Sequence, residues 1–258
     1  MDKLFLAISI LCFLGGFAYA VSGLRAGKLY DTRANLFVMA AGFAFLSIAL
    51  SFRGQMHHSC PITSLYEVLI FLSWSMVLLY FILGRSFRLS LLGVFTAPLV
   101  LGFQLVALAG FFLADKPDAD AATRRMDVWL ELHASVSLIA FGSFALAGIA
   151  GLMFLVQNRQ LKRHQLKTLF YNLPPIRYLT IAVFRLIGIG LILLTVGIIS
   201  AFLMKEQPAS LHQGLSMVIW LVYASLLGLF AGKRIGNTKL AQGAVAAFSL
   251  PVITLLLL

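Results

Sequence analysis

WLELHASVSLIAFGSFALAGIAGLMFLV, residues 129–156, is a long apolar run that carries no charge after Glu131. An α-helix rises about 1.5 Å per residue, so a helix of this length crosses roughly 30 Å of hydrocarbon. Ser143, Ala147 and Gly151 recur every fourth residue and predict a face of small side chains on which a second helix packs closely. We therefore expect a transmembrane helix at the centre of a bundle.

The composition places the whole chain in the same class. Of its 258 residues, 61% are hydrophobic and 11% are charged, whereas apolar residues make up about half of a soluble domain. A net charge of +11 would suggest nucleic acid for a soluble protein, but here the basic residues stand in short loops between apolar runs. The chain is predicted to be an integral membrane protein that contacts the lipid bilayer and no nucleic acid.

Apolar runs of spanning length recur along the chain and predict an all-α bundle of eight transmembrane helices in a single domain, residues 1–258. The first run ends in Ala18-Tyr19-Ala20, as a signal-peptidase site does, but its positive charges follow it, so we expect an uncleaved helix. Pro98 is expected to kink the fourth helix. The expected spans are residues 4–24, 35–52, 64–83, 90–113, 129–156, 178–204, 211–231 and 240–258.

The loop charges predict the orientation of the bundle. Lys and Arg concentrate in the odd-numbered loops, above all in residues 157–177, and the only acidic stretch, residues 115–127, lies in an even-numbered loop. The positive-inside rule therefore predicts that both termini face outward. Four of the five histidines, His57, His58, His133 and His212, then share the outer side, while His164 lies inside.

Two of these histidines are candidate ligands. His133 and His212 each stand at the outward end of a span, and neutral imidazole is a common axial ligand of haem iron. Trp129 stands one turn before His133, at the depth where indole rings prefer to lie. A histidine at the mouth of a helix is more often an interfacial polar residue, and that alternative stays open.

Other polar residues allow two interpretations each. Ser64 and Glu67 have the spacing of a helix capping box, yet a carboxylate near a membrane interface also suits a proton relay or a ligand. Arg185, inside the sixth span, either extends to the lipid headgroups or faces the bundle interior. The pair His57-His58 is expected to be solvated, because no further ligand stands at zinc spacing.

Three segments resemble the CcsA-type cytochrome c assembly proteins. HSCPITSLYEVLIFLSW, residues 58–74, is similar to the family segment G-H-x-P-L-S-N-L-Y-E-S-L-I-F-L-x-W. Residues 129–156 are similar to its W-L-x-x-H-V-S segment, and FRLIGIGLILLTVGIISA, residues 184–201, resembles its next span. The resemblance implies that haem is handled at the outer membrane face for attachment to apocytochrome c. It makes His133 an axial ligand of the haem iron and other cytochrome c maturation proteins the partners.

The departures from the family pattern are specific. The tryptophan-rich WGxYWxWD loop is absent where this chain reads MKEQPASLHQ, residues 204–213, and the histidines expected after that loop and after the last span have no counterpart. The chain is therefore more similar to the HemX and YpjD branch of the superfamily. That resemblance implies a role near haem supply or cytochrome maturation without established chemistry. We expect a bacterial inner-membrane protein that is not itself an enzyme, because the tryptophan-rich loop is absent.

Haem handling is not the only class of function that these patterns allow. Two other classes of function stay open: a small transporter, because Pro98 and Pro251 interrupt spans and broken helices can frame substrate sites, and a structural or regulatory subunit that binds no haem. The candidates for haem binding are His133, His212, Trp129, Glu67, His58 and Arg185.

Overall fold

The structure is a computed structural model that describes residues 2–25, 32–57, 62, 64–87, 92–113, 128–162, 175–204 and 210–256. All regular elements in these residues are α-helices, and eight segments are long and apolar enough to cross a membrane. The prediction of an all-α multi-pass membrane protein is therefore confirmed. The helices are α1 Asp2–Arg25, α2 Thr32–His57, α3 Leu65–Phe87, α4 Leu92–Leu113, α5 Val128–Lys162, α7 Ile176–Phe202, α8 Ser210–Ala231, α9 Asn237–Ala247 and α10 Ser249–Leu256.

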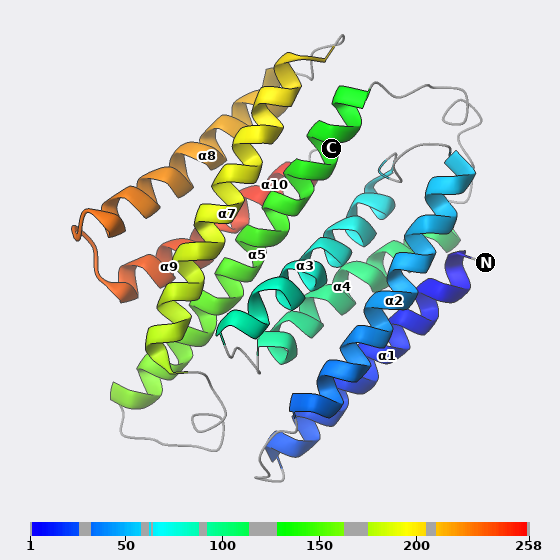
Figure 1. Cartoon of the computed structure of the whole chain (residues 1–258), viewed down its shortest axis with the longest axis horizontal. Coiled ribbons are helices and arrows are strands. Elements are labelled where there is room, and N and C mark those ends of the chain that lie inside the picture. Colours follow the sequence, from blue (N-terminus) through cyan, green and yellow to red (C-terminus); the bar gives the residue numbers. More distant parts are fainter. Residues whose placement is uncertain are drawn as a thin grey trace.

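The helices form two groups that lie side by side (Figure 1). In the first group α1 packs against α2 and α4, and α3 packs against α4. The second group contains α5, α7, α8, α9 and α10. α3 and α5 join the two groups at Gly142, where an added Cβ atom would overlap with Ser75 Oγ.

α5 lies at the centre of the second group and is buried along most of its length. Its small residues make the close contacts that their spacing predicts. Ser143 Oγ donates a hydrogen bond to the Leu186 carbonyl of α7 at 2.8 Å. A Cβ atom on Gly151 would lie 2.9 Å from the Ala241 carbonyl oxygen of α9. The prediction of a central helix with a face of small residues is confirmed.

Several helix boundaries differ from the prediction. α5 continues beyond residue 156 to Lys162, because Gln157 is buried and Asn158 Nδ2 donates to Thr238 Oγ1 of α9 at 3.4 Å. α2 likewise continues beyond residue 52 to His57. α4 is one helix with Pro98 inside it, as predicted, and the kink at Pro98 stays a prediction. Hydropathy marks where apolar residues end, whereas a helix continues as long as its backbone hydrogen bonds and packing persist.

The eighth span is not one helix, as predicted, but two. α9 ends at Ala247, Phe248 interrupts the helix, and α10 begins at Ser249. Pro251 has no N–H to donate to the Ala247 carbonyl, so the helical ladder cannot be complete at this point. Ser249 Oγ donates instead to the Ala246 carbonyl at 2.8 Å. Together α9 and α10 still make one segment of spanning length.

Candidate functional site

His133 is buried in the second turn of α5, with 7% of its surface exposed. Its Nδ1 atom lies 2.7 Å from the carbonyl oxygen of Gly197 on α7. A carbonyl oxygen can only accept, so Nδ1 carries the proton and donates it. In the neutral ring, Nε2 then carries the lone pair. Histidines that ligate a metal through one ring nitrogen are commonly oriented by a hydrogen bond from the other ring nitrogen to a carbonyl oxygen.

The close approach of α5 and α7 at this point depends on Gly197. An added Cβ atom would overlap with Ser137 Oγ, which lies one turn after His133 on α5. The Gly197 carbonyl also accepts a hydrogen bond from Ser200 Oγ at 2.7 Å. Ser137 Oγ is buried and has no hydrogen-bond partner among the described residues. The close packing of α5 against α7 therefore fixes the carbonyl that orients the imidazole.

A cavity of about 240 Å³ adjoins His133 between α5, α7 and α8. Small-molecule pockets span roughly 300–1,000 Å³, so the cavity fits one edge of a large planar ligand rather than the whole of it. The α7 side of the wall is apolar, and α8 contributes polar groups. The lining residues are His133, Ile198, Ala201, Phe202, Gln213, Gly214, Ser216 and Met217.

Two other sequence candidates lie near this cavity. Trp129 stands one turn before His133 in the first turn of α5 and is 40% exposed. His212 lies in the first turn of α8, and its neighbour Gln213 lines the cavity; the His212 side chain is outside the described residues. The beginning of α5, the end of α7 and the beginning of α8 lie at the same end of the bundle (Figure 1).

Glu67 lies in the first turn of α3, at this same end of the bundle. Ser64 Oγ accepts a hydrogen bond from the Glu67 backbone N–H at 3.3 Å, as the capping spacing predicts. The Glu67 side chain is buried at 1% exposure, and its Oε1 accepts a hydrogen bond from Arg53 Nη1 at 2.6 Å. This ion pair was not predicted, and it gives Glu67 a role in helix packing in addition to the cap.

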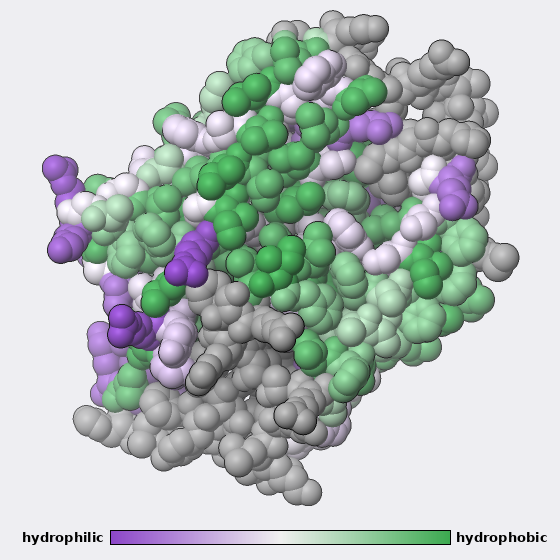
Figure 2. Space-filling view, in the orientation of Figure 1, coloured by the Kyte–Doolittle hydropathy of each residue, from purple (hydrophilic) through white to green (hydrophobic). Residues whose placement is uncertain are grey.

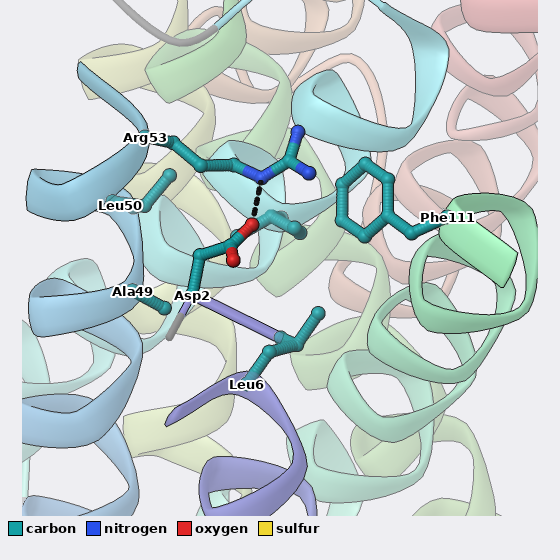
Figure 3. A pocket seen from close by; sticks show the side chains of 7 residues that line it. Asp2, Leu6, Ala49, Leu50, Arg53 and Phe111 are labelled. Carbon is teal, nitrogen blue, oxygen red and sulfur yellow. Dashed lines mark hydrogen bonds and ion pairs between the residues drawn. The ribbon is translucent and has the colours of Figure 1, made fainter. Parts of the chain in front are cut away.

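Arg53 connects all four helices of the first group. Its Nε atom donates to Asp2 Oδ2 of α1 at 3.0 Å, and its guanidinium carbon lies 3.6 Å from the ring centroid of Phe111 on α4 (Figure 3). With Glu67 on α3, these residues tie α1, α3 and α4 to α2. We call Asp2, Arg53, Glu67 and Phe111 the Arg53 clamp. Sequence reasoning missed it, although an arginine at the end of an apolar run near a buried carboxylate is a usable signal.

Arg185 does not join the His133 site. It lies on α7 three turns before Gly197, which is about 18 Å along the helix. Its side chain is exposed on the outside of the bundle. Of the two interpretations of this residue, the placement fits a side chain that extends toward lipid headgroups, and it does not fit one that faces the bundle interior.

Several sequence candidates fall outside the described residues. His58 and His164 are among them, as are the acidic segment 115–127 and most of the basic loop after α5. His57 ends α2, but its side chain is not described. Within the described part of the chain, no three His, Cys, Asp or Glu side chains come together as a metal site.

The fold and the site define a multi-pass helical membrane protein with a buried histidine at one mouth of its bundle. Residues 62–258 match the family described as Cytochrome C assembly protein. The match covers most of the chain, and the chain therefore belongs to this family. It begins at Ile62, so α1 and α2 precede the matched region and are tied to it by the Arg53 clamp.

Curated relatives carry two names. The chain is 24% identical to cytochrome c biogenesis protein CcsA of Guillardia theta over 230 residues, which is 78% of this chain and 75% of the relative. It is 25% identical to CcsA of Synechococcus sp. (strain CC9902) over 235 residues, or 80% and 74%. It is 30% identical to protein HemX of Brevibacillus brevis over 138 residues, or 53% and 50%. The chain thus spans about half of HemX and three quarters of these CcsA proteins.

Proposed function

We propose that this protein handles haem during cytochrome c maturation, with haem bound as cargo at the outer face of the membrane. The observation that best supports the proposal is the buried His133, whose Nδ1–H donates to the Gly197 carbonyl and leaves the lone pair on Nε2. The family assignment and the CcsA relatives support the role in cytochrome c maturation.

The cavity beside His133 suits the chemistry of a haem. Ile198, Phe202 and Met217 give it apolar walls, which match the faces of a porphyrin, and Gln213 and Ser216 add polar groups. Bound haem would supply an iron that neutral imidazole can ligate. The volume of about 240 Å³ implies that only part of the macrocycle lies within the described walls.

Each candidate residue of this chain would have a separate role in holding haem. His133 would provide Nε2, while the Gly197 carbonyl fixes the orientation of the ring. His212 would be the weaker choice for a second ligand of the iron, because it lies at the same end of the bundle but matches no histidine of the family pattern. Trp129 and His58 are proposed as neighbours of the site, and Glu67 as the residue that fixes the α3 end beside it.

The loop charges support a proposal for the orientation of the chain in the membrane. We infer that both termini and His133 face outward, and that residues 1–258 form one transmembrane domain in a bacterial inner membrane. The concentration of Lys and Arg in residues 157–177 supports this orientation. Partners would then be the other membrane proteins of cytochrome c maturation, which meet the chain on its outer side.

Absorption spectra of gently purified protein test the proposal. Parent protein should show a Soret band; His133→Ala should lower haem occupancy strongly, because iron loses its best-held ligand, and His212→Ala should lower it moderately. His164→Ala, at the opposite face, serves as the control and should retain parent occupancy. If His133→Ala keeps parent occupancy with an unchanged spectrum, His133 is not the ligand.

The same measurement separates this proposal from its main rival. If no preparation of the parent protein carries haem or takes it up from solution, a structural or regulatory subunit is the better interpretation. The similarity to HemX over 138 residues motivates that alternative. In that case His133 would serve only to join α5 to α7 through the Gly197 carbonyl.

A further inference from the structure

A second cavity opens at the other end of the bundle, far from His133. It has a volume of about 490 Å³ and lies between the beginning of α7 and the turn that joins α8 to α9. Its wall is mostly apolar, with one cation and two neutral polar side chains. Its lining includes Thr180, Ile181, Phe184, Phe230, Lys233 and Asn237. The cavity is therefore amphipathic, with an aromatic floor and a cationic rim.

The backbone at Lys233 is unusual. Its φ angle is 56°, and it alone among the described non-glycine residues has a positive φ. The Lys233 N–H donates to the Phe230 carbonyl at 3.0 Å and the Arg234 N–H to the Leu229 carbonyl at 2.9 Å, which together make a Schellman helix end. Glycine normally occupies this left-handed position, because a side chain there is strained. Here a lysine occupies it and lines the cavity.

Among the described residues, the charged side chains at this end of the bundle are all basic. Arg159, Lys162, Arg177, Arg234 and Lys239 all lie at this end of the bundle, on the helix ends and turn that surround it. Figure 2 shows hydrophilic side chains gathered along the left edge, over the α8–α9 turn and the beginning of α7.

The acidic side chains are at the other end. Among the described residues these are Asp2, Glu67 and Glu131, and all three lie at the end of the bundle that holds His133. A ligand with negative charge would therefore meet no described carboxylate near Lys233. The electrostatics favour an anion at this rim, at the level where lipid headgroups begin.

From this geometry we infer that the cavity binds an acidic phospholipid, with the headgroup phosphate on Lys233 and an acyl chain against Ile181, Phe184 and Phe230. Phe184 and Phe230 pack with ring centroids 5.8 Å apart and provide an apolar wall for the chain. Arg185 stands one turn after Ile181 on the same face of α7, within reach of the same headgroup level. A free phosphate would gain nothing from the aromatic wall, so the shape of the cavity favours the lipid.

Native mass spectrometry in mixed micelles tests the inference. With phosphatidylglycerol as the probe, the parent protein should retain one lipid more tightly than with phosphatidylcholine. Lys233→Gln should lower the affinity at least severalfold. Ala231 also lines the cavity, so Ala231→Phe should fill part of it and lower the affinity without changing the charge. Lys162→Gln removes a cation from the same end outside the cavity wall and should keep parent affinity.

The strained backbone at Lys233 allows a second test, in which lipid binding and the melting temperature should change in opposite directions. Lys233→Gly should weaken phosphatidylglycerol binding and yet raise the melting temperature in a neutral detergent, because glycine relieves the left-handed backbone. Three results would each overturn the inference. The parent protein could bind the two lipids equally well, Lys233→Gln protein could bind phosphatidylglycerol as tightly as the parent, or inorganic phosphate alone could stabilise the parent protein as much as phosphatidylglycerol does. None of these outcomes touches the haem proposal, which concerns the opposite end of the molecule.

Discussion

A single backbone carbonyl holds the most important side chain of the candidate site. Gly197 O accepts hydrogen bonds from His133 Nδ1 and Ser200 Oγ, both at 2.7 Å. The sequence could indicate His133, because a histidine at the mouth of an apolar run is visible as a pattern. It could not indicate its partner, since every residue carries a carbonyl and the register of α5 against α7 fixes which one is met.

Gly197→Ala should separate these contacts. The added methyl group overlaps with Ser137 Oγ, and overpacking of this kind costs about 1–3 kcal/mol. We expect a lower melting temperature in detergent together with a loss of any haem bound at His133. Gly188→Ala is the matched control on the same helix, because its Cβ atom would meet nothing within 4 Å. If both variants behave alike, close packing at Gly197 does not control the site.

At the scale of the helix, the apolar pattern predicted which segments cross the membrane but not where each helix ends. α5 was expected to end at residue 156 and instead reaches Lys162, since α9 packs beside Gln157 and Asn158. Pro98 and Pro251 both stand inside apolar runs of the sequence. α4 nevertheless continues through Pro98, whereas the eighth span is divided into α9 and α10 before Pro251. Neighbouring helices decide such cases, and a single sequence does not contain their positions.

The Arg53 clamp leads to a prediction about how the first four helices assemble. Arg53→Met leaves the buried Glu67 carboxylate without its cation, and the loss of one partner of a buried pair costs about 3 kcal/mol or more. Thermal unfolding in detergent should show a large decrease in melting temperature. Arg159→Met, at an exposed position near the end of α5, should change it little.

A double variant distinguishes the ion pair from simple loss of packing. Arg53→Met combined with Glu67→Leu removes Arg53 together with the buried Glu67 carboxylate. Only the half-buried Asp2 then lacks its Arg53 contact, so much of the stability should return. If the double variant is as unstable as the sum of the two single variants, the ion pair does not explain the effect.

At the scale of the whole molecule, the central claim depends on which side of the membrane holds His133. The Lys and Arg distribution predicts that residues 157–177 lie inside and residues 115–127 outside. In a chain with Cys12 and Cys60 replaced by serine, an impermeant thiol reagent should label Asp120→Cys in intact cells. It should label Gln165→Cys only after the membrane is opened. The reverse pattern would place His133 and the candidate haem site on the cytoplasmic side.

The most direct measurement replaces the ligand and then restores it. His133→Gly removes the imidazole and leaves a gap beside the Gly197 carbonyl, and free imidazole in solution can enter such a gap. We expect that His133→Gly protein loses most of its Soret band and that added imidazole restores it at the parent position, while imidazole leaves the parent spectrum unchanged. A His133→Gly protein that keeps the parent Soret band without imidazole would contradict axial ligation by His133.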